Sequence, residues 1–233
     1  MRIVVFPGVL RPPIDCRLLA GTITERGLAR GGSVLDVFTG TGALGLAALG
    51  AGAREAVAVD ISRLAVLNAR LNAALNRARM EVVRGDMFEP VRGRGFDLIV
   101  ANPPYVPSES DRLPARGPAR AWEAGSDGRV FLDRLCDQAA AHLNPGGTVA
   151  IVQSSICGER ATLERLARTG LEPAVLARRS GPLGPIAAAR VGMLEERGLL
   201  RPREREEELL VIAGTRTRRS QPAAGSPAAK ATA

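Results

Sequence analysis

Short apolar runs alternate with longer stretches of helical spacing along most of the chain. The runs are rich in Val and Ile and are bounded by Gly or charged residues, which is typical of strands buried on both faces of a parallel sheet. Seven runs fit this description, at residues 33–37, 56–60, 81–84, 96–101, 148–153, 174–178 and 209–213. The pattern therefore predicts a seven-stranded sheet.

Helical spacing fills the gaps between these runs. It covers residues 43–49, 62–75, 130–142 and 157–169, and a further helix is expected from about Asp15. Ser62 follows a strand directly and is placed to cap its helix, whereas Pro145 and the two glycines after it cannot continue the third helix. The alternation favours a single α/β domain with an open, doubly wound, mostly parallel Rossmann-like sheet.

Three segments fall outside the alternation. Residues 1–30 form a lead-in, and the α/β domain is expected over 31–214. Residues 180–208, rich in Arg and Glu, are expected to form a partly helical hairpin inserted before the last strand. Residues 215–233 are rich in Ala, Pro, Ser and Arg and are predicted to be a disordered basic tail.

The composition limits the kinds of protein to which this domain can belong. The 233 residues can bury a substantial core, which must be aliphatic because aromatic residues make up only 3%. No stretch reaches the roughly 18 apolar residues of a membrane span, and early prolines interrupt any signal-peptide region. Cys16, Cys136 and Cys157 form no CxxC pair, so we expect buried or idle thiols in a reducing cytoplasm. Ligand-spaced His and Cys are absent, so no metal site is predicted.

The formal charge of +8 is only a weak indication of a nucleic-acid partner. Four of the eight excess charges lie in the predicted tail, on Arg216, Arg218, Arg219 and Lys230. The 180–208 insertion has five arginines that can dock RNA. Six glutamates balance them, which is more typical of a solvated helical face.

A glycine-rich loop joins the first predicted strand to the first helix of the sheet. Gly40, Gly42 and Gly45 match GxGxxG, which by itself indicates a dinucleotide phosphate at a helix N-terminus. Asp36, however, lies near the end of the preceding strand. A carboxylate there can hold an ammonium group or an ordered water, and it hinders the binding of phosphates.

Acidic residues also follow the next two strands. Asp60 lies 20 residues beyond Gly40 and can accept both hydroxyls of a ribose, although it can instead cap the helix beside Ser62. Asp86 can accept the exocyclic amine of adenine, although it can also belong to a plain surface turn. Three acids after three successive strands fit adenosine with an ammonium-bearing group, which favours S-adenosylmethionine over NAD.

The fourth strand runs directly into the sequence Asn-Pro-Pro-Tyr at 102–105, on the edge where open α/β sheets bind ligands. Pro103 and Pro104 have fixed φ and no N–H, so they give a stiff backbone with free carbonyl oxygens. The Asn102 side chain offers another acceptor, and Tyr105 can pack on a planar group. Two fixed acceptors can bind both hydrogens of one –NH2 group. The other interpretation is a Pro-rich loop that merely ends a strand.

An amide or aryl-amine nitrogen is a poor nucleophile because its lone pair is delocalised. Hydrogen bonds from its two N–H groups to fixed acceptors return electron density to the nitrogen and orient its lone pair. Methyl transfer then depends on orientation and preorganised dipoles more than on a strong base. The loop therefore predicts an N-methyltransferase.

Together these motifs resemble class I methyltransferases, and specifically the HemK/PrmC-type glutamine-N5 methyltransferases of translation release factors. The resemblance covers about residues 6–178 and the last strand. It rests on the 36–42 loop, Asp60, Asp86 and the 102–105 loop.

Two outer segments extend the resemblance. The sequence AWEAGSDG at 121–128 is similar to a W-x-G-G-x-D-G stretch of that family, with Ala124 in place of Gly. The segment 9–15 resembles the family's P-x-x-D-[ST] motif, with Cys16 in place of Ser or Thr. Both segments depart from the family at one position.

The resemblance implies residues for the cofactor and for the acceptor. S-adenosylmethionine would be bound by Asp36, Thr39, Gly40, Thr41, Gly42, Asp60, Ile61, Asp86, Met87 and Asn102. The target nitrogen would be bound by Asn102, Pro103, Pro104 and Tyr105. The implied substrate is the Gln of a Gly-Gly-Gln loop in a peptide-chain release factor. From the resemblance we expect a compact form without the N-terminal helical domain of the bacterial enzymes, similar to members that often work with a small activating subunit.

Two other kinds of function remain open. The loop also suits adenine N6 in RNA or DNA, or a small-molecule amine, because those nitrogens are equally planar. A base-flipping enzyme needs a basic, aromatic-lined cleft, however, and only Tyr105 and Trp122 are available. The other kind is an NAD-linked oxidoreductase or an inactive binding module. An oxidoreductase needs a proton-transfer residue, and the single His, His142, ends a helix, where a structural role is expected.

Overall fold

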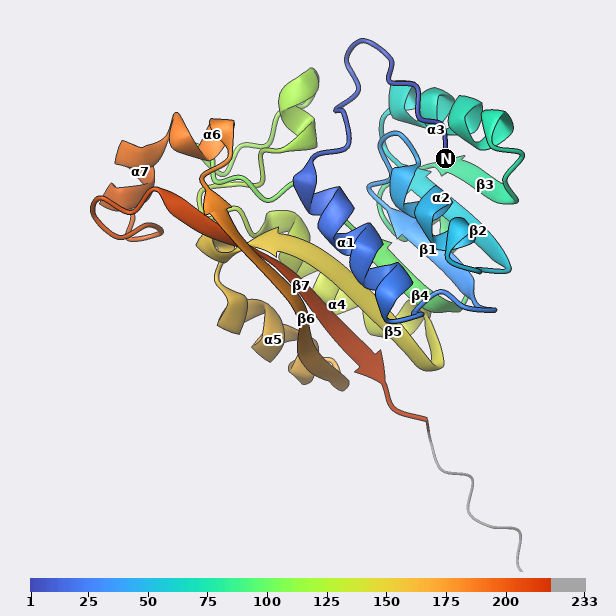
Figure 1. The fold of residues 1–233 in the computed structure, drawn as a ribbon. Helices are drawn as coiled ribbons and strands as arrows, with labels where there is room; N and C mark the ends of the chain where they lie inside the picture. The colour runs from blue at the N-terminus through green and yellow to red at the C-terminus, as the bar shows by residue number, and fades with distance from the viewer. Residues whose placement is uncertain (219–233) are drawn as a thin grey trace, which may run out of the picture.

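The computed structural model describes residues 1–218, which contain a seven-stranded sheet (Figure 1). The strands are β1 (Ser33–Val37), β2 (Glu55–Asp60), β3 (Met80–Arg84), β4 (Phe96–Ala101), β5 (Leu143–Ser154), β6 (Leu171–Pro182) and β7 (Glu206–Arg216). Their order is β3-β2-β1-β4-β5-β7-β6. Strands β1 to β5 pair in parallel, and β7 is antiparallel to β5 and β6. The strand order reverses between β1 and β4, which is where open α/β sheets bind ligands.

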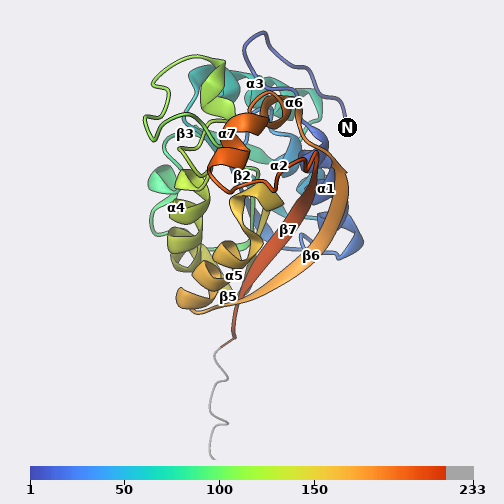
Figure 2. The ribbon, with the colours of Figure 1, turned by 90° about the vertical axis from the view of Figure 1, so that its left-hand side faces the viewer.

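Helices cover both faces of the sheet (Figure 2). They are α1 (Ile14–Glu25), α2 (Ala43–Gly50), α3 (Arg63–Leu75), α4 (Val130–Ala139), α5 (Glu159–Arg168), α6 (Pro185–Ala188) and α7 (Val191–Glu196). Successive side chains of a strand point to opposite faces. Val34 of β1 therefore packs with α1 and α2, whereas Leu35 and Val37 pack with α4 and α5. No helix within the described residues is long and apolar enough to cross a membrane.

The predicted α/β class and mostly parallel seven-stranded sheet are confirmed, with changes in several bounds. Strands β5, β6 and β7 are longer than predicted, and β6 and β7 pair with each other along their whole length. The predicted insertion at 180–208 is therefore shorter, at 183–205, and holds α6 and α7. The predicted tail began at 215, but β7 continues to Arg216, and residues 219–233 lie outside the described part.

The lead-in is held to α3 by a ladder of asparagine side chains. Asn68, Asn72 and Asn76 recur every four residues, which places them on one face of the helix. Their side-chain oxygens accept hydrogen bonds of 2.8–3.0 Å from the backbone N–H groups of Phe6, Val4 and Arg2. Their amide nitrogens donate to the carbonyls of Val4 and Arg2. The ladder fixes an extended segment for which the sequence predicts no element, and the residues that follow it reach the functional site.

Candidate active site

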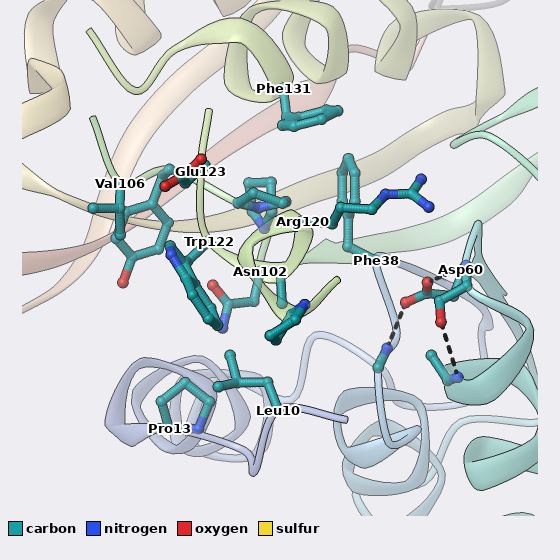
Figure 3. Close-up of a pocket in the computed structure, with 18 of the residues that line it drawn as sticks. Leu10, Pro13, Phe38, Asp60, Asn102, Val106, Arg120, Trp122, Glu123 and Phe131 are labelled. Carbon is teal, nitrogen blue, oxygen red and sulfur yellow. Dashed lines mark hydrogen bonds between the residues drawn. The ribbon is translucent and has the colours of Figure 1, made fainter. Parts of the chain in front are cut away.

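A cavity of about 880 Å³ opens at the carboxyl ends of β1, β2, β3 and β4 (Figure 3). This volume lies in the range of roughly 300–1,000 Å³ that small-molecule sites occupy. Its lining includes most residues predicted for the site, and the 102–105 loop contributes all four of its side chains. Among the lining residues are five acids and two arginines, so the cavity favours cationic over anionic ligand groups.

Asp36 lies behind the glycine-rich loop rather than on the cavity wall. It is fully buried, and its Oδ2 accepts hydrogen bonds from Thr39 Oγ1 at 2.6 Å and from Gly45 N at 2.8 Å. These bonds turn the carboxylate into the loop, and the predicted contact of Asp36 with the cofactor stays a prediction. Its Oδ1 is buried without a partner among the described residues, and an ammonium group or an ordered water would satisfy that oxygen.

The loop itself depends on glycine at two positions. Gly40 has φ of +55° and Gly42 has φ of +83°, a region that other residues rarely adopt. A Cβ on Gly42 would also lie 2.9 Å from Met80 Cε. Thr39, Gly40 and Thr41 line the cavity as predicted, whereas Gly42 does not, because it begins α2 against α3 and β3.

Burial raises the pKa of Asp36 to about 7, against the hydrogen bonds from Thr39 and Gly45 that lower it. Between the ordinary value of 3.8 and about 7, the folded chain keeps a proton that the unfolded chain has lost. The free energy of unfolding should therefore fall as the pH rises through this window and level off above it. We expect Asp36→Asn to reduce the drop in Tm between pH 5 and pH 8 by several degrees, because the amide does not titrate. Thermal melts of ligand-free protein test this, and equal slopes for both proteins would contradict it.

Asp60 ends β2 with both carboxylate oxygens facing backbone donors. Oδ2 accepts from Gly40 N and Oδ1 accepts from Ser62 N, each at 2.9 Å (Figure 3). Each oxygen keeps acceptor capacity for one hydroxyl. Ser62 is the residue that caps α3, since its side chain accepts from Ala65 N. Burial raises the pKa of Asp60, and the two backbone hydrogen bonds and Arg120 oppose that change.

Asp86 and Met87 follow β3 and form a more open part of the wall. Asp86 Oδ2 accepts from Arg134 at 2.7 Å, and both side chains of this ion pair are about 40% exposed. Met87 has φ of +51°, a strained conformation for a side chain of this kind, and it is 3% exposed. Ile61 lines the cavity from the turn after Asp60. A ligand amine at Asp86 would have to share the carboxylate with Arg134.

The 102–105 loop is held at both ends by the first turn of α1. Asn102 Nδ2 donates to Cys16 Sγ at 3.1 Å, and Tyr105 Oη donates to Asp15 Oδ2 at 2.6 Å. Pro103 and Pro104 are buried between these two anchors. No donor among the described residues reaches the Pro103 carbonyl or Asn102 Oδ1, so both oxygens remain acceptors. Two free acceptors therefore lie at the tip of β4.

Two further contacts hold the backbone of Tyr105 in place. Its carbonyl accepts from the thiol of Cys157 at 3.0 Å, and Gly128 packs directly against the same carbonyl. Gly128 has φ of +74°, and any Cβ there would collide with the Tyr105 oxygen. We expect Gly128→Ala to lower the free energy of unfolding by about 2–4 kcal/mol, from overpacking and left-handed strain together. Chemical denaturation tests this. Gly192→Ala is the control, because a Cβ on Gly192 would meet no atom within 4 Å. Equal losses of unfolding free energy in the two variants would contradict the packing argument.

Two arginines tie the α6–α7 insertion to the loop after Tyr105. Arg190 donates to the carbonyl of Pro107 at 2.8 Å and forms a 2.6 Å ion pair with Glu123. Arg197 donates to the carbonyls of Ser108 and Glu109 at 2.6 and 2.8 Å. These two side chains are engaged in internal contacts, so neither RNA docking nor a purely solvated face describes them. The insertion also closes one side of the cavity with residues 184–187.

Comparison with known proteins places this site in a family. The family model described as "Methyltransferase small domain" matches residues 13–115. A Methanocaldococcus jannaschii protein assigned as a protein N5-glutamine methyltransferase is 35% identical over 182 residues, which span 78% of this chain and 90% of that protein. The chain belongs to the glutamine N5-methyltransferase family. A second relative, a release factor glutamine methyltransferase of Geobacter sulfurreducens, is 31% identical, with 81% of this chain and 68% of the relative covered.

Solved structures share the fold of this glutamine N5-methyltransferase. The E. cuniculi Mtq2-Trm112 complex, responsible for methylation of the eRF1 translation termination factor, matches with a TM-score of 0.60 at 24% identity, covering 91% of this chain and 100% of that one. The T. thermophilus 16S rRNA methyltransferase RsmC, in complex with AdoMet and guanosine, matches with a TM-score of 0.61 at 22% identity, covering 93% and 49%. At these identities the matches establish the class I methyltransferase fold alone.

Several residues that line the cavity were not predicted from the sequence. Arg120 lies near Asp60, and Phe131 packs edge-on against Phe38 with 5.6 Å between ring centroids (Figure 3). Phe38 has φ of +62° directly after β1. Leu10 and Pro13 close the cavity from the lead-in. Nothing in the pattern of apolar positions identifies these residues. Within residues 1–218, no three His, Cys, Asp or Glu side chains gather into a group that could hold a metal.

Proposed function

We propose that this chain transfers a methyl group from S-adenosylmethionine to the side-chain nitrogen of the Gln in a Gly-Gly-Gln loop of a peptide-chain release factor. The observation that carries the proposal is the pair of unpaired acceptors, Asn102 Oδ1 and the Pro103 carbonyl, at the tip of β4 beside the cavity. Membership of the glutamine N5-methyltransferase family and the release-factor relatives support the choice of acceptor.

The residues of the cavity fit this cofactor. Asp60 presents two acceptor oxygens for the ribose hydroxyls, and Asp86 with Met87 lines the part suited to adenine. The partnerless oxygen of Asp36 lies behind the loop, where an ammonium group or a bridging water would complete its hydrogen bonds. When bound, S-adenosylmethionine supplies a methyl group on a sulfonium centre, which a nitrogen lone pair can displace in line.

The chain acts on the acceptor through orientation rather than through a general base. Asn102 Oδ1 and the Pro103 carbonyl would each accept one N–H of the Gln amide and so direct its lone pair toward the methyl group. Burial and Asp15 raise the pKa of the Cys16 thiol to about 12 and that of Tyr105 well above its ordinary value. Neither group accepts a proton near neutral pH. The amide proton would leave to water after methylation has made it far more acidic.

Charge distinguishes a protein acceptor from a nucleic acid. The acceptor end of the cavity is lined by Asp15 and Glu207 in addition to the cofactor-side acids, whereas the charge of Glu123 is offset by its ion pair with Arg190. An adenine within RNA or DNA would bring phosphates toward these carboxylates, and their repulsion is costly at short range. A neutral Gly-Gly-Gln loop has no such penalty.

Methyl transfer in a lysate of the source organism tests the proposal. The purified chain and labelled S-adenosylmethionine are added, and release-factor peptides containing Gly-Gly-Gln are analysed by mass spectrometry. We expect one methyl group on the Gln of that loop. Label found only in nucleic acid or in a small metabolite would contradict the proposal and favour an adenine or small-molecule N-methyltransferase.

We also propose that a second protein subunit covers the outer face of α3, as the Trm112 chain accompanies Mtq2 in the complex described above. Every large apolar side chain that the described residues expose lies within 1–14 or 61–75, including Leu67 and Leu71 of α3. The range 61–80 contains four arginines and no acid. A second copy of this chain would bring like charges together, so a partner with an acidic rim around an apolar centre fits better.

Co-expression with the Trm112-like protein of the same organism tests this second proposal. We expect a 1:1 complex by light scattering, and its loss in a Leu67→Asp/Leu71→Asp variant that still binds S-adenosylmethionine. A fully active monomer that ignores the added protein would contradict it.

A further inference from the structure

Two consecutive residues at the start of α1 hold the two ends of the 102–105 loop. Asp15 binds Tyr105 through its carboxylate, and Cys16 binds Asn102 through its thiol. Helix α1 is itself anchored in the core, since Leu19 and Ile23 are fully buried against the sheet. The thiol of Cys16 is therefore held in place where it contacts Asn102, the side chain that carries one of the two acceptor oxygens.

The contact matters because an asparagine side chain has two unlike ends. Only the oxygen can accept an N–H of the substrate amide, and rotation by a half turn would present a second donor instead. Figure 3 shows the amide nitrogen of Asn102 turned toward α1 and its oxygen turned away from that helix. The side chain therefore has the orientation that methyl transfer requires before any substrate arrives.

The surroundings of Cys16 favour this orientation. Asp15 Oδ1 accepts from the backbone N–H of Cys16 at 2.6 Å, so a carboxylate lies directly beside the thiol. Its negative charge attracts the N–H end of the Asn102 amide and repels the carbonyl end. Burial and Asp15 keep the thiol protonated near neutral pH, with a pKa of about 12, so the sulfur acts as a neutral acceptor and not as a nucleophile.

We propose that Cys16 is a positioning residue, which holds the Asn102 amide with its oxygen toward the acceptor nitrogen. The role of the oxygen rests on the proposed function, whereas the orientation itself does not. Cys16 lines the cavity, but its sulfur is engaged by Asn102, so it acts through that side chain.

An isosteric pair of variants separates the hydrogen bond from packing. Cys16→Thr and Cys16→Val have the same shape, but only Thr keeps an acceptor for Asn102 Nδ2. We expect Val to lower kcat about 10-fold or more, with KM for the peptide and the affinity for S-adenosylmethionine within about threefold of wild type. Thr should restore kcat to within about threefold. Cys136→Ala, which removes a buried thiol of α4 far from the loop, should leave kcat unchanged.

A spectroscopic readout keeps the inference testable without an acceptor. The side-chain NH2 signals of Asn102, identified by their absence in Asn102→Ala, should shift in Cys16→Val and return toward wild type in Cys16→Thr. If the β-branched variants fail to fold, Cys16→Ala and Cys16→Ser replace them with the same expectations.

Identical kcat and identical Asn102 signals in the Val and Thr variants, or equal loss in both, would overturn the role of Cys16. Failure of the wild-type chain to methylate a Gly-Gly-Gln peptide would overturn the proposed function alone. In that case the NMR comparison decides whether Cys16 orients Asn102.

Discussion

Replacing Asn102 by Ala is expected to lower kcat by about 100-fold or more while the affinity for S-adenosylmethionine stays near that of the wild-type protein. The variant removes one of the two acceptors that direct the lone pair of the substrate nitrogen. Loss of a single preorganised polar contact to a reacting group costs about 100- to 1,000-fold in kcat in other enzymes. The Pro103 carbonyl remains, and one acceptor leaves the amide free to rotate. Single-turnover methylation of a Gly-Gly-Gln peptide and calorimetry with the cofactor measure the two quantities.

Asn76→Ala provides the matched control for this variant. Asn76 anchors Arg2 at the far end of the asparagine ladder and does not line the cavity. Its loss should leave kcat within about twofold. Unchanged turnover in Asn102→Ala would contradict the role assigned to the loop. If the affinity for S-adenosylmethionine fell together with kcat, the main role of Asn102 would be to bind the cofactor.

Replacing Asp60 by Ala is expected to weaken S-adenosylmethionine binding by about 100-fold or more. Each hydrogen bond to a charged group contributes about 1.5–3 kcal/mol, and the ribose would lose two of them. Gly40 N and Ser62 N would also lose their acceptors, so the glycine-rich loop should become less ordered and the Tm should fall. Isothermal titration calorimetry measures the affinity directly.

Asp86→Ala gives the comparison for this second variant. The Asp86 side chain is 39% exposed and shares its carboxylate with Arg134, so we expect a loss of only about 10-fold or less. Equal losses in the two variants would count against the ribose assignment of Asp60. Unchanged affinity in Asp60→Ala would exclude that assignment.

The sheet and the location of the site follow from the sequence because each rests on local rules. Apolar runs bounded by Gly and charge mark strands such as β1 and β4, whose predicted bounds agree with the structure. Parallel strands align their carboxyl ends, so residues that follow successive strands converge. For this reason the sequence predicts that Asp60, Asp86 and Asn102 lie close together, and all three line one cavity in the structure.

Two kinds of contact could not be predicted from the sequence. The direction of the Asp36 side chain at the end of a strand depends on the donors that the next loop offers, here Thr39 and Gly45. The other contacts join residues that are distant in the chain. The hydrogen bond between Cys16 and Asn102 spans 86 residues. The ladder between the lead-in and α3 and the bonds made by Arg190 are likewise long-range. No periodicity encodes such pairings.

A crystal structure with S-adenosylhomocysteine and a Gly-Gly-Gln peptide tests the central claim most directly. The account predicts the side-chain nitrogen of the Gln within about 3.2 Å of both Asn102 Oδ1 and the Pro103 carbonyl oxygen, with its face toward the sulfur of the cofactor product. A peptide bound with these two oxygens turned away from the Gln nitrogen would contradict it.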